Sequence, residues 1–230
     1  MRFLFFDTAL DHLTAGLAHG EQVIAEHSEH CPRGHADRLV PLLRDLMDAS
    51  GIGFGALEGI GCTRGPGTFT GIRSGIAAAR AMGLAADLPA VGVPTLDALA
   101  RTAITGPTAE APVTAAIDAR RGELYLRHFR PDGTPVGPPL RSATETAGSL
   151  CPEGTRLLVG SGAAILRDVL GRGIPRTDIS SPSPRALAVT LSQALRGRRG
   201  HGYTSGPKPL YLRPADATPP ADWRQPPEVA

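Results

Sequence analysis

The chain has 230 residues, of which 41% are hydrophobic, and a formal net charge of +2 at neutral pH. This length and composition are enough for a sizeable buried core in one domain or two small lobes. The net charge is too small for a general nucleic-acid-binding surface, because such surfaces neutralise phosphates with many cations. Any role on RNA is therefore expected to depend on a second protein.

The N-terminus carries no predicted signal peptide or membrane span. Its apolar run ends at Asp7, after only four residues, whereas a signal sequence or a span needs a much longer run. Three cysteines, Cys31, Cys62 and Cys151, stand at unrelated spacings, which argues against a disulfide framework and against a zinc knuckle. We expect a cytoplasmic protein that does not enter a membrane.

The first 30 residues read as three short strands in succession. Their apolar or alternating character predicts an antiparallel meander over residues 2–9, 13–20 and 22–30. Apolar residues then recur at helical spacing over residues 35–50, and Gly51 is suited to end that helix.

Two helices are expected after the meander. Pro41 lies inside the first, so this helix either begins near Asp37, with Pro41 in its first turn, or is kinked at Pro41. Residues 57–93 give a strand, a glycine-rich turn, a helix from about Thr70 to Ala86 and another strand. This order is a β-loop-α-β unit.

The second half of the chain repeats the theme of strands followed by helices. A segment of Pro, Gly and Thr at residues 105–112 is typical of a linker, and we place the lobe boundary near residue 108. The last predicted helix has Ser183 as its N-cap and Pro184 at its first position. We therefore predict an N-terminal lobe of residues 1–108, a C-terminal lobe of residues 109–215 and a flexible tail of residues 216–230.

The most distinctive stretch is a glycine-rich turn over residues 64–75 that leads into the second helix. Such a turn either exposes backbone N–H groups to an anion or lets another backbone approach closely. A Walker-A phosphate loop is excluded, because Lys208 is the only lysine of the chain. Two interpretations stay open: close packing of strand and helix, or a nucleotide or anion contact by Gly65, Gly67, Thr68 and Gly71.

Six blocks of sequence, in this order and spacing, resemble the TsaB family, formerly called YeaZ. Together they extend over most of the chain, and the glycine-rich block is the most specific of them. The blocks are FFDTA at 5–9, PRGHADRLVPLL at 32–43, RGPGTFTGIRSGIAAARAMG at 64–83, VGVPTLDALA at 91–100, IDARRGELY at 117–125 and PLYLR at 209–213.

The resemblance implies an α/β protein of the actin-like ATPase (ASKHA) fold, with two lobes of mixed sheet plus helices and a reduced second lobe. It also implies a non-catalytic scaffold subunit in the biosynthesis of N6-threonylcarbamoyladenosine in tRNA, which forms a heterodimer with the transferase TsaD. The ATPase TsaE would join this complex, and tRNA would be reached only through it. ATP or ADP would bind at the level of the complex, and the isolated chain would hold no cofactor and would self-associate.

The two predicted helices are the expected docking surface for TsaD. Apolar residues of the first helix span nearly half its circumference, which is more than a surface helix needs. The second helix is rich in Gly and Ala, which permits close helix packing. The alternative is that both helices are buried in this chain's own core. The expected docking residues are Leu39, Leu42, Leu43, Leu46, Met47, Arg73, Ile76, Ala78 and Arg80.

Two enzyme classes are alternatives to the scaffold. A metal-dependent peptidase-like enzyme of the same superfamily would need the His-x-x-x-His pair that TsaD relatives carry. Here His30 and His35 are five residues apart, with Pro32 between them. A small-molecule kinase would need a glycine hairpin after the first strand, which the sequence lacks. Because the cluster of His27, His30, Cys31 and His35 matches no standard metal site, we expect neither a metal nor catalytic residues.

Two turns allow a nucleotide or catalytic interpretation beside a structural one. Asp7 and Asp11 follow the first strand, where a kinase would hold its general base, but Asp7 is also suited to capping a turn. The turn at Gly160, Ser161 and Gly162 either lies near an adenine, as in related ATPases, or is an ordinary entry into a helix.

Overall fold

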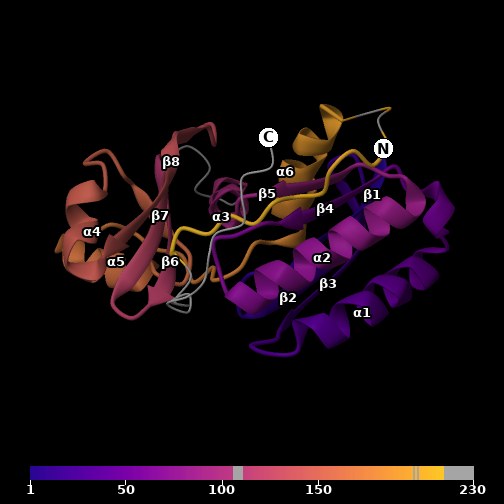
Figure 1. Cartoon of the computed structure of the whole chain (residues 1–230). Helices are drawn as coiled ribbons and strands as arrows, with labels where there is room; N and C mark the ends of the chain where they lie inside the picture. Colours follow the sequence, from indigo (N-terminus) through magenta and orange to yellow (C-terminus); the bar gives the residue numbers. More distant parts are fainter. Residues whose placement is uncertain (106–110, 199, 201, 215–230) are drawn as a thin grey trace, which may run out of the picture.

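The computed structural model describes residues 1–105, 111–198, 200 and 202–214. Its elements form two lobes, each built on its own mixed sheet (Figure 1). The expected boundary near residue 108 and the expected tail of residues 216–230 lie outside the described residues.

The sheet of the first lobe joins an antiparallel meander to two parallel strands. Its strands are β1 (Arg2–Asp7), β2 (His12–His19), β3 (Gln22–His30), β4 (Gly59–Thr63) and β5 (Ala90–Val93). Their order is β3-β2-β1-β4-β5. The pairs β1–β2 and β2–β3 are antiparallel, which confirms the predicted meander, whereas β1–β4 and β4–β5 are parallel.

Helices cover both faces of this sheet. Helices α1 (His35–Ser50) and α2 (Phe69–Ala86) lie side by side on one face, and α6 (Pro184–Arg196) packs on the other (Figure 1). Successive side chains of a strand point to opposite faces. Accordingly, Leu4 of β1 belongs to the core under α1 and α2, and its neighbour Phe5 belongs to the core under α6.

The position of α6 differs from the predicted division of the chain, which assigned this segment to the second lobe. Its residues Leu191 and Leu195 pack on β4, where Cβ atoms at Gly61 and Gly59 would lie 2.9 and 2.8 Å from those leucines. The two glycines therefore let α6 approach the first sheet closely. The first lobe is made of two separate segments of the chain.

The second lobe repeats the first with one strand fewer. Its strands have the order β8-β7-β6-β9, with two antiparallel pairs and one parallel pair, as in β3-β2-β1-β4. This repeat confirms the expected duplication and the expected reduction of the second lobe. The elements of this lobe are β6 (Val113–Arg120), β7 (Glu123–Phe129), β8 (Pro135–Ala143), β9 (Leu157–Val159), α4 (Thr144–Leu150) and α5 (Ala163–Leu170). Helix α3 (Thr95–Ile104), which follows β5 in the chain, packs on β6.

The helix ends follow the predicted capping residues. Gly51 ends α1 in the left-handed conformation, with φ 67°, and donates its N–H to Asp48. The Ser183 side chain accepts a hydrogen bond from the N–H of Ala186 at the start of α6. Pro41 lies in the second turn of α1, because the helix begins at His35. Of the two alternatives, the one with a start near Asp37 and Pro41 in the first turn therefore does not hold. Within the described part of the chain, no helix is both long enough and apolar enough to cross a membrane.

Candidate functional site

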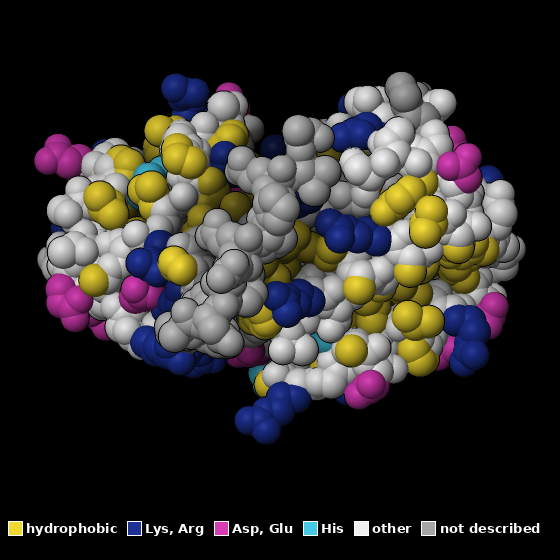
Figure 2. All heavy atoms as spheres, in the orientation of Figure 1, with side chains coloured by type: hydrophobic (Ala, Val, Ile, Leu, Met, Phe, Trp, Pro, Cys, Tyr) yellow, Lys and Arg dark blue, Asp and Glu magenta, His cyan; other side chains and the backbone are white. Residues whose placement is uncertain are grey.

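A cleft of about 1100 Å³ opens between the two lobes. Its apolar lining comes from both halves of the chain, with Leu10 and Ile72 from the first lobe and Ile117 from the second. In Figure 2, Lys and Arg side chains stand around hydrophobic side chains near the middle of this face. The cleft therefore combines apolar walls with positive charge.

The glycine-rich turn packs against the hairpin that connects β1 and β2. The Thr68 N–H donates to the carbonyl oxygen of Ala9 at 2.7 Å. A Cβ atom on Gly67 would collide with that same oxygen, and one on Gly71 would collide with the carbonyl oxygen of Thr8. Gly67 and Gly71 are thus needed for this close backbone approach, which favours the packing interpretation of the turn.

The expected anion contacts do not converge on one surface. Gly67 and Thr68 line the cleft, whereas Gly65 and Gly71 are not among its lining residues. Gly65 has φ 103° and packs against the carbonyl oxygen of Leu210. A nucleotide contact made jointly by these four residues stays a prediction that the packing does not favour.

The second lobe repeats this arrangement at its own helix entry. The Gly162 N–H donates to the carbonyl oxygen of Ala116 at 3.0 Å, and a Cβ atom on Gly160 would collide with the same oxygen. The hydroxyl of Ser161 accepts from the Asp118 N–H at 3.1 Å. The turn is thus a tightly packed entry into α5. Of its three residues, Ser161 lines the cleft.

Asp7 at the end of β1 is completely buried. Its Oδ1 accepts hydrogen bonds from the Ala9 N–H, at 3.0 Å, and from the Thr63 hydroxyl. Burial raises the pKa of this carboxyl above its ordinary value of 3.8, and the two hydrogen bonds lower it by less. Asp7 caps the turn, as the sequence suggested, and does not line the cleft.

A cluster of two rings and one guanidinium stands at the edge of the cleft. Arg73 of α2 lies 3.6 Å from the ring centroid of Phe69, and its Nε donates to the hydroxyl of Tyr211 at 2.9 Å. The two rings are stacked with their centroids 5.5 Å apart. The sequence predicts only a docking role for Arg73. The placement of Phe69 and Tyr211 in two of the family-like sequence blocks was the available signal.

Ion pairs hold the two lobes together around the cleft. Arg120 of the second lobe lies 3.5 Å from Asp11 of the first. Residues 202–214 run from the first lobe toward the second (Figure 1), and Arg213 in this segment donates from Nε to Glu123 at 2.9 Å. This hydrogen bond lowers the pKa of Glu123. One ion pair thus connects the two lobes, and a second connects residues 202–214 to the second lobe.

The cluster of histidines and Cys31 does not form a common ligand set. His30 stacks edge-on with His12, with ring centroids 5.2 Å apart, whereas the ring of His35 is directed at the backbone carbonyl of His12, 3.2 Å away. The thiol of Cys31 donates to a backbone carbonyl. Among the described residues, no three His, Cys, Asp or Glu side chains are placed to hold a metal ion.

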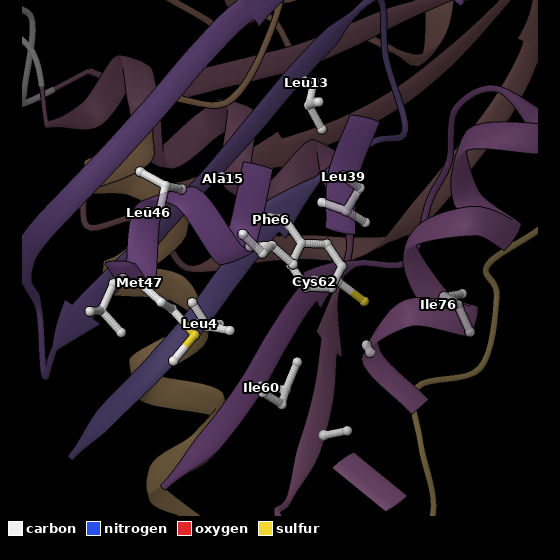
Figure 3. Close-up of a cluster of buried hydrophobic side chains, with 14 of the residues drawn as sticks. Leu4, Phe6, Leu13, Ala15, Leu39, Leu46, Met47, Ile60, Cys62 and Ile76 are labelled. Carbon is white, nitrogen blue, oxygen red and sulfur yellow. The ribbon is translucent and has the colours of Figure 1, made fainter. Parts of the chain in front are cut away.

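Most of the expected docking residues lie in the core of their own lobe, which corrects the prediction for them. Figure 3 shows Leu39, Leu46 and Met47 of α1 pointing toward β1. These three side chains, with Leu43 and Ile76, are buried and offer no surface to a partner. The partly buried Leu42 and Ala78 pack on the same core, so that only Arg73 and Arg80 are exposed.

The exposed face of α2 presents small and apolar side chains instead. Three exposed residues recur at helical spacing along this face: Ala77, Ala81 and Leu84. The first of them lies between Arg73 and Arg80, and the other two lie between Arg80 and the end of the helix. Leu84 is 67% exposed, which is the largest fraction among the exposed large hydrophobic residues in the described part of the chain. These three residues, called here the α2 stripe, belong to none of the hydrophobic core clusters of the described chain.

A protein-family model matches residues 23–169, more than half of the chain, and describes TsaD, the tRNA N6-adenosine threonylcarbamoyltransferase. The TsaB protein of Escherichia coli, described as a tRNA threonylcarbamoyladenosine biosynthesis protein, is 40% identical over 132 residues. That match covers 57% of this chain and 56% of the E. coli protein, so the chain aligns with little more than half of this relative.

Longer matches extend the similarity to nearly the whole chain. An uncharacterized protein of Mycobacterium tuberculosis is 33% identical over 222 residues, which cover 94% of this chain and 93% of that one. The solved structure of YeaZ from Pseudomonas aeruginosa superposes with a TM-score of 0.79 at 27% identity, over 92% of this chain and 99% of the other. With its two-lobed, actin-like architecture, the chain belongs to the TsaB (YeaZ) family.

Proposed function

We propose that this chain acts in the biosynthesis of threonylcarbamoyladenosine in tRNA, as a non-catalytic subunit that docks the transferase TsaD. Two relatives of the chain are described as tRNA threonylcarbamoyladenosine biosynthesis proteins, and the TsaD family model matches residues 23–169 of the chain. The subunit supports the transferase by a surface of the first lobe. Its small net charge is in keeping with tRNA being held mainly by other parts of the complex.

The observation that carries the docking proposal is the α2 stripe. Leu84 is two-thirds exposed, and Ala77 and Ala81 bring the helix backbone near the surface. An exposed leucine next to small residues suits the close packing of a partner helix. Arg73 and Arg80 flank the stripe and would add polar contacts at its rim.

The packing of the first hairpin supports a subunit without its own chemistry. The backbone of Thr8 and Ala9 occupies the space beside Gly67 and Gly71, where a phosphate would need to approach. Asp7, the candidate general base, is buried against Thr63 and caps a turn. The kinase alternative is therefore disfavoured, and the peptidase alternative has no ligand set among the described residues.

The remaining parts of the proposal concern the assembly. We propose a heterodimer with TsaD that TsaE joins in the cytoplasm, with tRNA and ATP or ADP bound at the level of the complex. A chain without its partner would cover the α2 stripe by forming a homodimer, because an apolar face tends to be buried.

Co-expression with the TsaD homologue of the same organism tests the proposal. We expect the two proteins to elute together in size-exclusion chromatography and TsaD to need this chain for the modification of tRNA. Separate elution with full TsaD activity would refute the docking role. Hydrolysis of peptides or turnover of ATP by the isolated chain would restore one of the enzyme alternatives.

A further inference from the structure

Four buried polar side chains meet beside the core that the second sheet forms with α4 and α5. Thr114 of β6 and His128 of β7 are cross-strand partners, and Cys151 and Thr155 lie in the segment between α4 and β9. Each of the four is at most 8% exposed. Buried polar groups cost free energy unless they are hydrogen-bonded, so the contacts among them are informative.

The hydrogen bonds of this cluster connect the thiol to the histidine ring. The Cys151 thiol donates to the Thr155 hydroxyl at 3.5 Å. The Thr155 and Thr114 hydroxyls lie 3.0 Å apart, and the Thr114 hydroxyl lies 2.9 Å from Nδ1 of His128. Because a hydroxyl can accept one hydrogen bond and donate another, these groups form a continuous path for a proton from the sulfur to the ring.

The histidine at the end of this path is suited to accept. Burial lowers the pKa of His128 below its ordinary value of 6.5, so the ring is uncharged at neutral pH and one nitrogen can act as an acceptor. Its Nε2 has no hydrogen-bond partner among the described residues. A buried nitrogen left unsatisfied is unusual in a network that serves packing alone.

Cys151 is also the cysteine that a small molecule can reach. It lines a pocket of about 460 Å³, whose other lining residues come from α4, α5 and the segments that follow these helices. Cys31 and Cys62 are each 1% exposed and line neither this pocket nor the cleft between the lobes. Burial raises the pKa of Cys62, which makes that thiol less reactive. The pocket and the hydrogen-bonded path thus meet at one sulfur atom.

We propose that Cys151 is a reactive thiol that forms a mixed disulfide with small disulfides entering this pocket. Thr155 and Thr114 are positioning residues, which lead the thiol proton to Nδ1 of His128. The Cys151 sulfur bonds to one sulfur of the small disulfide, whose S–S bond breaks, and the other sulfur leaves as a thiolate with the electron pair. Cys151 is thereby oxidised, and the small disulfide is reduced.

The isolated full-length chain tests this proposal, which is independent of the docking of TsaD. The native protein is treated with 2,2′-dithiodipyridine, an uncharged disulfide, and the released thione is followed by its absorbance. Peptide mapping then identifies the labelled cysteine. We expect Cys151 to react at least about tenfold faster than Cys31 and Cys62 in the native protein, and all three to react at similar rates in denaturant.

A pair of substitutions at Thr155 tests the path for the proton. Thr155→Val has nearly the same shape but removes the hydroxyl beside the thiol, and we expect Cys151 to react at least about threefold more slowly. Thr155→Ser keeps a hydroxyl and should recover most of the rate, which a merely structural role would not explain. The matched control, Thr190→Val on α6, removes a hydroxyl in the first lobe and should leave the rate unchanged.

Three results would overturn the proposal. They are equal rates for the three cysteines in the native protein, labelling of Cys31 or Cys62 ahead of Cys151, and a folded Thr155→Val variant that reacts as fast as the wild type. A thermal melt establishes that each variant is folded. Peptide mapping of the wild type decides the reactivity of Cys151 even if Thr155→Val does not fold.

Discussion

The hydroxyl of Thr8 donates a hydrogen bond of 2.8 Å to the carbonyl oxygen of Gly71, which ties the first hairpin to the first turn of α2. The carbonyl oxygen of Thr8 lies where a Cβ atom on Gly71 would be. One turn further along α2, a Cβ atom on Gly75 would lie 2.5 Å from the Thr8 hydroxyl oxygen. The glycines of the family-like block are thus explained by backbone packing.

The substitution Gly71→Ala should destabilise the protein, although alanine is the better helix former. The added methyl group collides with the Thr8 carbonyl, and we expect a loss on the order of 2 kcal/mol in the free energy of unfolding. Urea denaturation followed by circular dichroism measures this loss. As a control, Gly55→Ala places its methyl in open space and should change stability little. An increase in stability for Gly71→Ala would contradict the packing described here.

The substitution Asp7→Asn should change how stability depends on pH. Burial raises the native pKa of Asp7 above 3.8, so between 3.8 and the native pKa the folded state binds more protons than the unfolded state. In that window the wild type loses stability as pH rises, by about 1.4 kcal/mol for each pH unit. Asparagine carries no such penalty and keeps an oxygen acceptor for Ala9 and Thr63.

Thermal melts of the wild type and of Asp7→Asn from pH 4 to pH 7 measure this difference. The melting temperature of the variant, relative to the wild type, should rise with pH. A difference that is constant, or that falls as pH rises, would show that the carboxyl is not held in a desolvating environment.

The substitution Leu46→Asp should unfold the protein or destabilise it by roughly 4 kcal/mol or more, because it buries a charge without a partner. Leu46 belongs to the core between α1 and the sheet and is 9% exposed. Circular dichroism and a thermal melt check this expectation. A folded Leu46→Asp variant with a near-normal melting temperature would contradict the placement of α1 on the sheet.

Local sequence patterns were sufficient to predict features that depend only on residues close together in the chain. The meander, the stop of α1 at Gly51 and the N-cap of α6 at Ser183 all follow from such patterns. Strand β8 and helix α4 were not predicted, because Pro135, Pro138 and Pro139 argue against an inner strand, and β8 is an edge strand.

The properties that depend on long-range packing were the ones the sequence did not reveal. Helix α6 packs on the first sheet although 90 residues separate it from β5, and its amphipathic pattern does not indicate which sheet it covers. Arg73 and Tyr211 meet across 138 positions. On α1 the side chains of Leu39, Leu43, Leu46 and Met47 are buried in the lobe's own core, so the width of an apolar helix face does not by itself distinguish a core face from a docking face.

The docking of TsaD is tested most directly by measuring how tightly TsaD binds the Leu84→Asp variant of this chain. Leu84 is exposed in the isolated chain, so the variant should fold normally, whereas a contact with a partner helix would desolvate the new charge. Leu150→Asp is the matched control, since Leu150 is an exposed leucine of the second lobe. Titration against the TsaD homologue, with a melt of each variant, should show at least about tenfold weaker pairing for Leu84→Asp and unchanged pairing for Leu150→Asp. A folded Leu84→Asp variant that pairs as tightly as the wild type would contradict docking through the α2 stripe.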